Sequence, residues 1–315
     1  MNMYKSGFAQ LIEDMLNFKT ALGHKMNSYK WNLLSFDRFC QKHFPDESIL
    51  TKEIALAWCN DMESNSKSGY RLHAIREFGK YLVANDKEAF VIPSTLLPKY
   101  TADVPYIFSD NELVNFFRAT DSISVFRRKS SPLLEYIVPV IFRLQYACGL
   151  RPQEVRQLKA NNFDFTNNII YIEESKWCKD RRLAVRSDIM GLCDKYNNIA
   201  NFIIPNRTYF FQSPKGKAYE RAWLTSTFHR CWKLSGNTNE KGSCVPYDLR
   251  HNFATQTLMK WVEEGVDINE YIPYLSAYMG HATFSNTFYY IHLLPERLSR
   301  MDFTKLNGVI PEVPL

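Results

Sequence analysis

The chain has 315 residues, of which 45% are hydrophobic and 23% are charged; this composition is ordinary for a folded protein and excludes a disordered or collagen-like chain. A chain of this length suits two domains of roughly 100–200 residues each. Lys and Arg outnumber Asp and Glu by 39 to 33, for a net charge of +6, which permits a polyanionic partner but excludes a histone-like electrostatic coat.

Cysteine usage and hydropathy limit the compartment in which the protein works. The 7 cysteines are scattered, odd in number and without a C-x-x-C pair, so we expect neither a zinc site nor a disulfide framework. The first residues lack the apolar core of a signal peptide, and no run of 18 apolar residues occurs. We therefore expect a cytoplasmic protein in a reducing compartment, with no membrane partner.

The first part of the chain has the pattern of short amphipathic helices. Apolar residues recur there at helical spacing in four sets, around Phe8–Leu16, Tyr29–Cys40, Ile54–Trp58 and Ile75–Leu82. They predict a helical domain over residues 1–95. Pro93, Pro98 and Pro105 then bracket a stretch that a helix cannot cross, which predicts a linker over 96–106 and a second domain over 107–315.

The second domain is predicted to mix helices with a small sheet. Ser109 and Glu112 have the spacing of a capping box, and an apolar helix over about 132–148 should end at Gly149, with Pro152 beginning the next. Residues 167–174 and 182–186 have the pattern of two strands joined by a polar segment, and 209–211 of a further short strand. The predicted fold is mainly α, with a small antiparallel β-sheet in the C-terminal domain.

Three segments of this domain carry residues suited to phosphodiester chemistry. They are YACGLRPQEV from residue 146, PYDLRHNFAT from 246 and YMGHATFSNTFYY from 278. Two arginine forks match the non-bridging oxygens of a phosphate and hold developing negative charge. A tyrosine beside them can attack phosphorus and hold DNA covalently without a metal ion.

These three boxes, in this order and with the strand pair between the first two, resemble the tyrosine recombinase (phage integrase) family over about residues 107–300. The resemblance implies Arg151 and Arg250 as the two catalytic arginines, His281 as the histidine of the Gly-His box and Tyr290 as the nucleophile. It implies Glu154 as the acid that supports Arg151. It also implies strand cleavage through a 3′-phosphotyrosine, with neither metal nor cofactor.

The turn between the two predicted strands supplies a further candidate. The family carries a general-acid lysine there, and Lys176 lies at the matching distance from Arg151, with Lys179 as the alternative. A second interpretation is a solvated hairpin tip in which Lys179, Arg181 and Arg182 bind DNA phosphates without reading sequence. The two interpretations are compatible.

The second box departs from the family at its first position. The family has His-x-x-Arg there, whereas this chain has Tyr247 ahead of Arg250. A phenol with a pKa of about 10 is a poorer proton acceptor at neutral pH than imidazole. Tyr247 is therefore predicted as a catalytic residue of a variant site, where it accepts a proton or only hydrogen-bonds the phosphate or Tyr290.

Neighbouring candidates receive other roles. Adjacent helical residues point about 100° apart, so only one of Tyr289 and Tyr290 can face the phosphate, and we expect Tyr289 to pack. His251 is expected to support the site by orienting its neighbours. The other histidines have no motif around them and are expected at the surface or in packing: His24, His43, His73, His229 and His292.

The resemblance also implies partners and a biological setting. The helices of residues 1–95 match the family's core-binding domain, which clamps double-stranded DNA at a specific recombination site, although a helical domain of that size is equally compatible with protein contacts alone. Exchange between two duplexes implies a homo-tetramer on DNA, with accessory proteins as further partners and a bacterial, nucleoid-associated location. We expect integration or excision of a mobile element. The alternatives are Xer-type resolution of chromosome dimers and a non-catalytic DNA-binding accessory protein.

Overall fold

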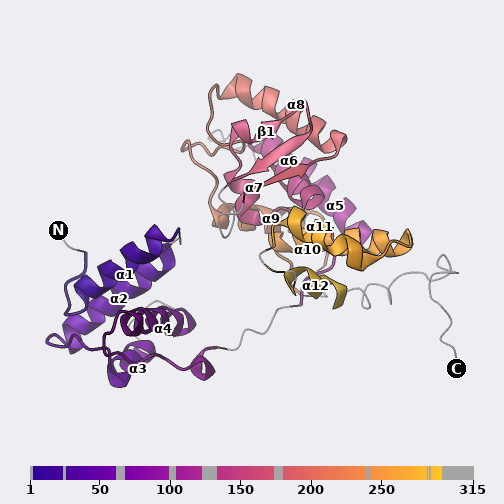
Figure 1. Cartoon of the computed structure of the whole chain (residues 1–315). Helices are drawn as coiled ribbons and strands as arrows, with labels where there is room; N and C mark the ends of the chain where they lie inside the picture. Colours follow the sequence, from indigo (N-terminus) through magenta and orange to yellow (C-terminus); the bar gives the residue numbers. More distant parts are fainter. Residues whose placement is uncertain are drawn as a thin grey trace, which may run out of the picture. The chain divides into compact units, whose positions relative to one another are not determined.

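The protein folds as two units, residues 1–103 and residues 104–315 (Figure 1). The structure is a computed structural model that describes residues 3–23, 26–61, 68–98, 104–122, 133–173, 180–238, 242–281, 283 and 285–292. The boundary between the units falls inside the predicted linker. None of the described helices is both long and apolar enough to cross a lipid bilayer.

The N-terminal unit contains the four helices that its apolar spacing predicts. They are α1 (Ala9–Ala21), α2 (Asn27–His43), α3 (Lys52–Asn60) and α4 (Ser68–Ala84), followed by the short 3₁₀ turn η1 (Ser94–Leu96). The buried rings of Phe8, Phe36, Phe78 and Trp58 meet in the core, with centroids of Phe8 and Phe36 5.2 Å apart. Edge-to-face and tilted contacts of this kind hold the four helices together.

The C-terminal unit contains eight helices in the parts that the structure describes, with a sheet between the third and fourth. The elements before the sheet are α5 (Asp110–Asp121), α6 (Leu134–Cys148), α7 (Pro152–Gln157) and the 3₁₀ turn η3 (Ala160–Asn162). The strands are β1 (Phe163–Asp164), β2 (Ile169–Ile172) and β3 (Arg181–Ala184). The elements after it are α8 (Ser187–Ile203), α9 (Arg221–Leu234), α10 (Pro246–Glu263), α11 (Ile268–Met279) and α12 (Ser285–His292). The predicted class, mainly helical with a small antiparallel sheet, is confirmed.

Local signals read from the sequence are formed as predicted at three helix ends. The Ser109 hydroxyl accepts from the Glu112 backbone N–H, and the Glu112 carboxylate accepts in return from the Ser109 N–H at 2.7 Å, which is the capping box that begins α5. Gly149 ends α6 in the left-handed conformation, with φ of +57°, and Pro152 begins α7. The end of α6 and the start of α7 hold Arg151, which lies between them, in a tight corner.

The sheet is antiparallel in the order β1-β2-β3. Ile170 pairs with Leu183 in register, and both are buried. β1 was not predicted, because two residues are too few to show an alternating pattern. The strand predicted over 209–211 is wrong: within it, only Tyr209 forms a bridge, with Lys159. The chain turns at Phe210 and Phe211, both of which are fully buried.

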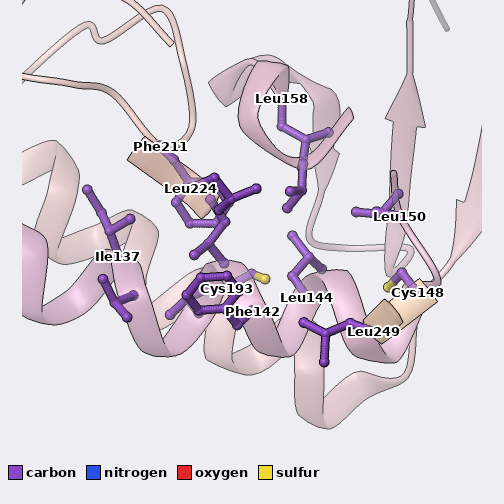
Figure 2. Packing of buried hydrophobic residues seen from close by; sticks show 14 of the residues in the cluster. Ile137, Phe142, Leu144, Cys148, Leu150, Leu158, Cys193, Phe211, Leu224 and Leu249 are labelled. Carbon is purple, nitrogen blue, oxygen red and sulfur yellow. The ribbon is translucent and has the colours of Figure 1, made fainter. Parts of the chain in front are cut away.

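The main core of the C-terminal unit forms around α6, the most apolar of its helices (Figure 2). Ile137, Phe142 and Leu144 point from this helix into the cluster with Leu150, Leu158 and Leu249 from neighbouring segments. A smaller cluster joins α10, α11 and α12 and includes Leu258, Leu275, Met279 and Tyr290. The six described cysteines carry free thiols and are buried. On α10, Arg250 follows Leu249 of the main cluster, and Tyr290 on α12 belongs to the smaller one.

Candidate active site

The first candidate arginine is held in the corner between α6 and α7. The Arg151 backbone N–H donates to the Glu154 carboxylate at 2.9 Å, and its guanidinium forms an ion pair with the same carboxylate at 2.6 Å. Gly149 has no Cβ, and one built there would clash with the ring of Phe253 on α10. The corner therefore needs both the left-handed backbone of Gly149 and its lack of a side chain.

The second candidate arginine, Arg250, lies on α10 and is 0% exposed. Its guanidinium donates to the carbonyl of Gly149 at 2.6 Å and to the carbonyl of Met279 at 2.8 Å. Its Nε has no hydrogen-bond partner. Arg250 thus joins α6, α10 and α11, and one of its buried N–H groups is left unsatisfied.

Three arginines converge on the C-terminal end of α11. Arg181 donates to the carbonyl of Tyr278 at 2.8 Å, Arg250 donates to Met279, and Arg151 donates to Gly280. The last carbonyls of a helix lack partners within the helix and carry partial negative charge. Three guanidinium groups on three successive carbonyls satisfy them, and they fix the turn that leads directly into His281.

Glu154 neutralises part of this positive charge. Its two carboxylate oxygens receive Arg181 at 3.0 and 2.9 Å, in addition to Arg151. Burial alone would raise the pKa of Glu154, but hydrogen bonds and attraction from Arg181, followed by attraction from Arg151, outweigh it and lower the pKa to about 2. Glu154 is therefore ionised at every physiological pH.

The candidate nucleophile, Tyr290 on α12, points into the same region and is 2% exposed. Its hydroxyl lies 3.1 Å from Nδ1 of His251, and its ring stacks on His281 with centroids 6.1 Å apart. Burial raises the pKa of Tyr290, and the nearby Arg250 charge opposes the rise. The phenol is protonated in the free protein, so attack on phosphorus requires a group that takes its proton.

The two histidines beside Tyr290 differ in their hydrogen bonds. Nδ1 of His281 lies 2.7 Å from the Thr287 hydroxyl of α12, whereas Nδ1 of His251 faces the phenol. Burial and then the charge of Arg250 lower the pKa of His251 to about 4. Burial and then the charges of Arg250, Arg151 and Arg181 lower the pKa of His281 to about 3. Both imidazoles are neutral at pH 7.

The remaining predicted residues are placed less centrally. Tyr247 is 37% exposed, and its ring lies 4.9 Å from that of His251. Arg182 is exposed and its guanidinium lies over the Tyr171 ring at 5.5 Å, which leaves it accessible to a phosphate. Lys176 and Lys179 lie outside the described residues. So does the side chain of His292.

Arg181 does not have the surroundings that the hairpin-tip interpretation requires. Its side chain is 9% exposed, and all the hydrogen bonds described for it go to Glu154 and Tyr278. The expectation of a solvated, phosphate-binding Arg181 is corrected accordingly: it supports the arginine cluster from within. Position in the sequence gave no signal of this role, because its partners lie 27 and 97 residues away.

The contact between His251 and Tyr290 was not predicted from the sequence. His251 was expected only to orient its neighbours. A signal was present, since His251 follows Tyr247 by four residues and therefore lies on the same face of α10 one turn later. Among the residues that the structure describes, no group of three or more His, Cys, Asp or Glu side chains is arranged to hold a metal ion.

Comparisons with known proteins identify the family to which the chain belongs. Residues 111–297 match the model of the phage integrase family. The chain is 28% identical to an integrase/recombinase, y4rB, of Sinorhizobium fredii (strain NBRC 101917 / NGR234), over 94% of this chain and 98% of that protein.

Solved structures share the fold at lower sequence identity. A XerH site-specific recombinase bound to a palindromic difH substrate superposes with a TM-score of 0.61 at 19% identity, covering 87% of this chain and 78% of that one. The Tn1549 transposon integrase in complex with transposon right-end DNA gives a TM-score of 0.58 at 13% identity, covering 92% and 99%.

The family model covers more than half of the chain, and the arginines, histidine and tyrosine of its boxes meet at one site. The chain belongs to the phage integrase family. It is a site-specific DNA recombinase of the tyrosine type.

Proposed function

We propose that this recombinase cleaves and rejoins DNA through a 3′-phosphotyrosine formed on Tyr290. The observation that carries the proposal is the convergence of Arg151 and Arg250 on adjacent carbonyls, those of Gly280 and Met279, directly before His281. Two guanidinium groups so anchored can turn their remaining N–H donors to one phosphate, which is how a site stabilises a transition state electrostatically.

Each residue has a distinct part in the proposed step. The Tyr290 oxygen attacks phosphorus while Arg151, Arg250 and His281 stabilise the charge on the pentacoordinate phosphorane. Lys176 protonates the departing 5′ oxygen, and Tyr247, at the exposed edge of the site, hydrogen-bonds a phosphoryl oxygen. Attack by the 5′ hydroxyl of a partner strand reverses the step, so the phosphodiester bond energy is conserved.

The proposed partners follow from the same chemistry. Each protomer carries one nucleophile, and exchange between two duplexes breaks four strands, so we infer a homo-tetramer on double-stranded DNA. Residues 1–95 form the clamp that holds the DNA together with Lys179 and Arg182. The likeness of the fold to the Tn1549 transposon integrase supports integration or excision of a mobile element in a bacterial cytoplasm, with accessory proteins as further partners.

A covalent-trapping assay tests the reaction and the nucleophile together. The DNA site is first isolated by selecting duplexes that Tyr290→Phe protein binds, from a library that includes the DNA flanking the gene. A nicked version of that duplex then loses its 5′ hydroxyl fragment after cleavage and traps the adduct. An SDS-resistant protein–DNA adduct with the wild type and Tyr289→Phe, and none with Tyr290→Phe, is expected.

Two results would contradict the proposal. An adduct that persists in Tyr290→Phe would assign the nucleophile elsewhere. Specific retardation of the duplex on a native gel without any adduct from the wild type would identify a DNA-binding accessory protein instead.

A further inference from the structure

The proposed cleavage step needs an acceptor for the phenol proton of Tyr290, and Tyr247 is poorly suited to be one. Its hydroxyl belongs to a ring that is 37% exposed, and the contact described for that ring is with His251, at a centroid distance of 4.9 Å. Among the described residues, the hydrogen bond to the Tyr290 hydroxyl is made with His251 and not with Tyr247. Tyr247 is therefore not placed to take the phenol proton directly.

His251 has the geometry that Tyr247 lacks. It lies one turn further along α10, and its Nδ1 is 3.1 Å from the Tyr290 hydroxyl, within the distance at which a general base takes a proton directly. The alternative imidazole, His281, directs its Nδ1 to Thr287 at 2.7 Å and meets Tyr290 through ring stacking. Of these two imidazoles, only His251 has a described hydrogen bond to the phenol.

The protonation state of His251 fits the same role. The titratable or charged groups around it are Arg250 and Tyr247 on α10 and Tyr290 on α12, with His281 behind the Tyr290 ring. Burial and then Arg250 lower the pKa of His251 to about 4, so its ring is neutral at pH 7. A phosphodiester bound at Arg250 adds negative charge, which moves that pKa back toward neutrality, where general bases are most effective.

We propose that His251 is the general base of this enzyme and replaces the histidine that Tyr247 displaces from the second box. The step balances as follows: the Tyr290 oxygen–phosphorus bond forms, the bond from phosphorus to the 5′ oxygen breaks, and the phenol proton moves to Nδ1 of His251. The departing oxygen receives its proton from the general acid of the proposed function. Religation returns both protons, so His251 then acts as the acid toward Tyr290.

The inference rests on the proposed function, and the trapped-adduct duplex defined above measures it. The variants are His251→Asn, Tyr247→Phe and, as a matched control on α9, His229→Asn. Asparagine places an amide oxygen close to where Nδ1 lies, so it can still hydrogen-bond the phenol, but it does not accept a proton at these pH values. Adduct formation is followed under single-turnover conditions from pH 6 to 9.

The wild type, His229→Asn and Tyr247→Phe are expected to reach a plateau in rate above neutral pH, with Tyr247→Phe slower by less than about tenfold. His251→Asn is expected to be slower by about 10²–10⁴-fold at pH 7, the usual contribution of a general base. Because its phenol must ionise without help, its rate should rise about tenfold per pH unit.

A substitution at the nucleophile separates proton transfer from packing. Replacing Tyr290 by 3,5-difluorotyrosine lowers the phenol pKa, because the fluorines withdraw electrons, and thus reduces the need for a base. We expect it to restore most of the rate lost in His251→Asn. A His251 that merely packs against Tyr290 would give no such restoration.

The outcomes are separable. Absence of an adduct from the wild type would overturn the proposed function itself. If the wild type forms the adduct, three results would overturn the assignment of His251. His251→Asn could react at the wild-type rate, or difluorotyrosine could fail to restore its lost rate. The third is a rate that rises tenfold per pH unit in Tyr247→Phe and not in His251→Asn.

Discussion

Glu154 is an anion shared by two arginines of the site. Its side chain is 5% exposed, and it contacts Arg151 and Arg181 through both oxygens. Removing one partner from a buried ion pair is far more damaging than removing an exposed one, because the remaining charge is left without solvent or counter-ion. Here two positive charges would be left facing one another.

Glu154→Gln, which keeps the shape of the side chain, is expected to lower the free energy of unfolding by about 3 kcal/mol near pH 7. The matched control is Glu173→Gln. Glu173 forms an ion pair with Lys159 in which both side chains are 42% exposed. Its loss should change the free energy of unfolding by less than about 0.5 kcal/mol. Because the folded pKa of Glu154, about 2, is below its ordinary value of 4.5, this stabilisation is present above pH 4.5 and disappears toward pH 2. Denaturant unfolding at several pH values measures both effects, and equal losses in the two variants would contradict the argument.

At the scale of elements, the end of α11 organises the site more than any strand or loop does. Gly280 has φ of +65°, and a Cβ there would lie 2.7 Å from Nη1 of Arg181. The residue therefore needs glycine for two reasons, the left-handed backbone and the close approach of a guanidinium group. Gly236, just after α9, has φ of +72° but no atom within 4 Å of such a Cβ.

This pair of glycines allows a matched experiment. Gly236→Ala should cost only the left-handed backbone penalty of about 1 kcal/mol, and it should leave recombination unchanged. Gly280→Ala should cost at least about 1 kcal/mol more, because Arg181 must move, and it should lower the rate of adduct formation. Thermal unfolding and the trapping assay report the two effects. Similar losses of stability and similar rates in both variants would contradict the argument, because they would show that Arg181 moves aside without affecting the site.

Much of the fold could be predicted because it depends on local signals. The helical spacing of residues 1–95, the capping box at Ser109 and the Gly149 corner each depend on residues within a turn or two. The order of the boxes likewise indicated Arg151, Arg250 and Tyr290 as neighbours. By contrast, the partner of Arg181 and the contact of His251 with Tyr290 depend on how β3, α11 and α12 pack, and no local pattern encodes that packing.

At the scale of the whole molecule, two half-buried neutral histidines make the C-terminal unit sensitive to acid. The folded pKa values of His251 and His281, about 4 and about 3, lie below the ordinary value of 6.5. The unfolded chain therefore binds more protons than the folded one between these values, and stability falls as pH decreases through this range.

Between pH 7.5 and pH 5, each of these histidines should remove on the order of 2 kcal/mol from the free energy of unfolding of the unit formed by residues 104–315. Urea unfolding of the full chain at the two pH values, followed by a probe in that unit, measures the loss. His251→Asn should abolish about half of the pH dependence, and His229→Asn should serve as its control. An unchanged pH dependence in His251→Asn would show that burial of this ring carries no protonation cost.

The complete burial of Arg250, together with the 2% exposure of Tyr290, affects how the protein recognises DNA. A phosphodiester reaches these groups only after the side chains that cover them have shifted. Only the open form binds DNA, so the measured affinity equals the affinity of that form multiplied by the fraction of molecules that are open. Substitutions that loosen α12 would consequently tighten DNA binding and also expose the nucleophile to phosphodiesters outside the recombination site. Closure in the free protein thus weakens DNA binding and, in return, limits cleavage to the recombination site.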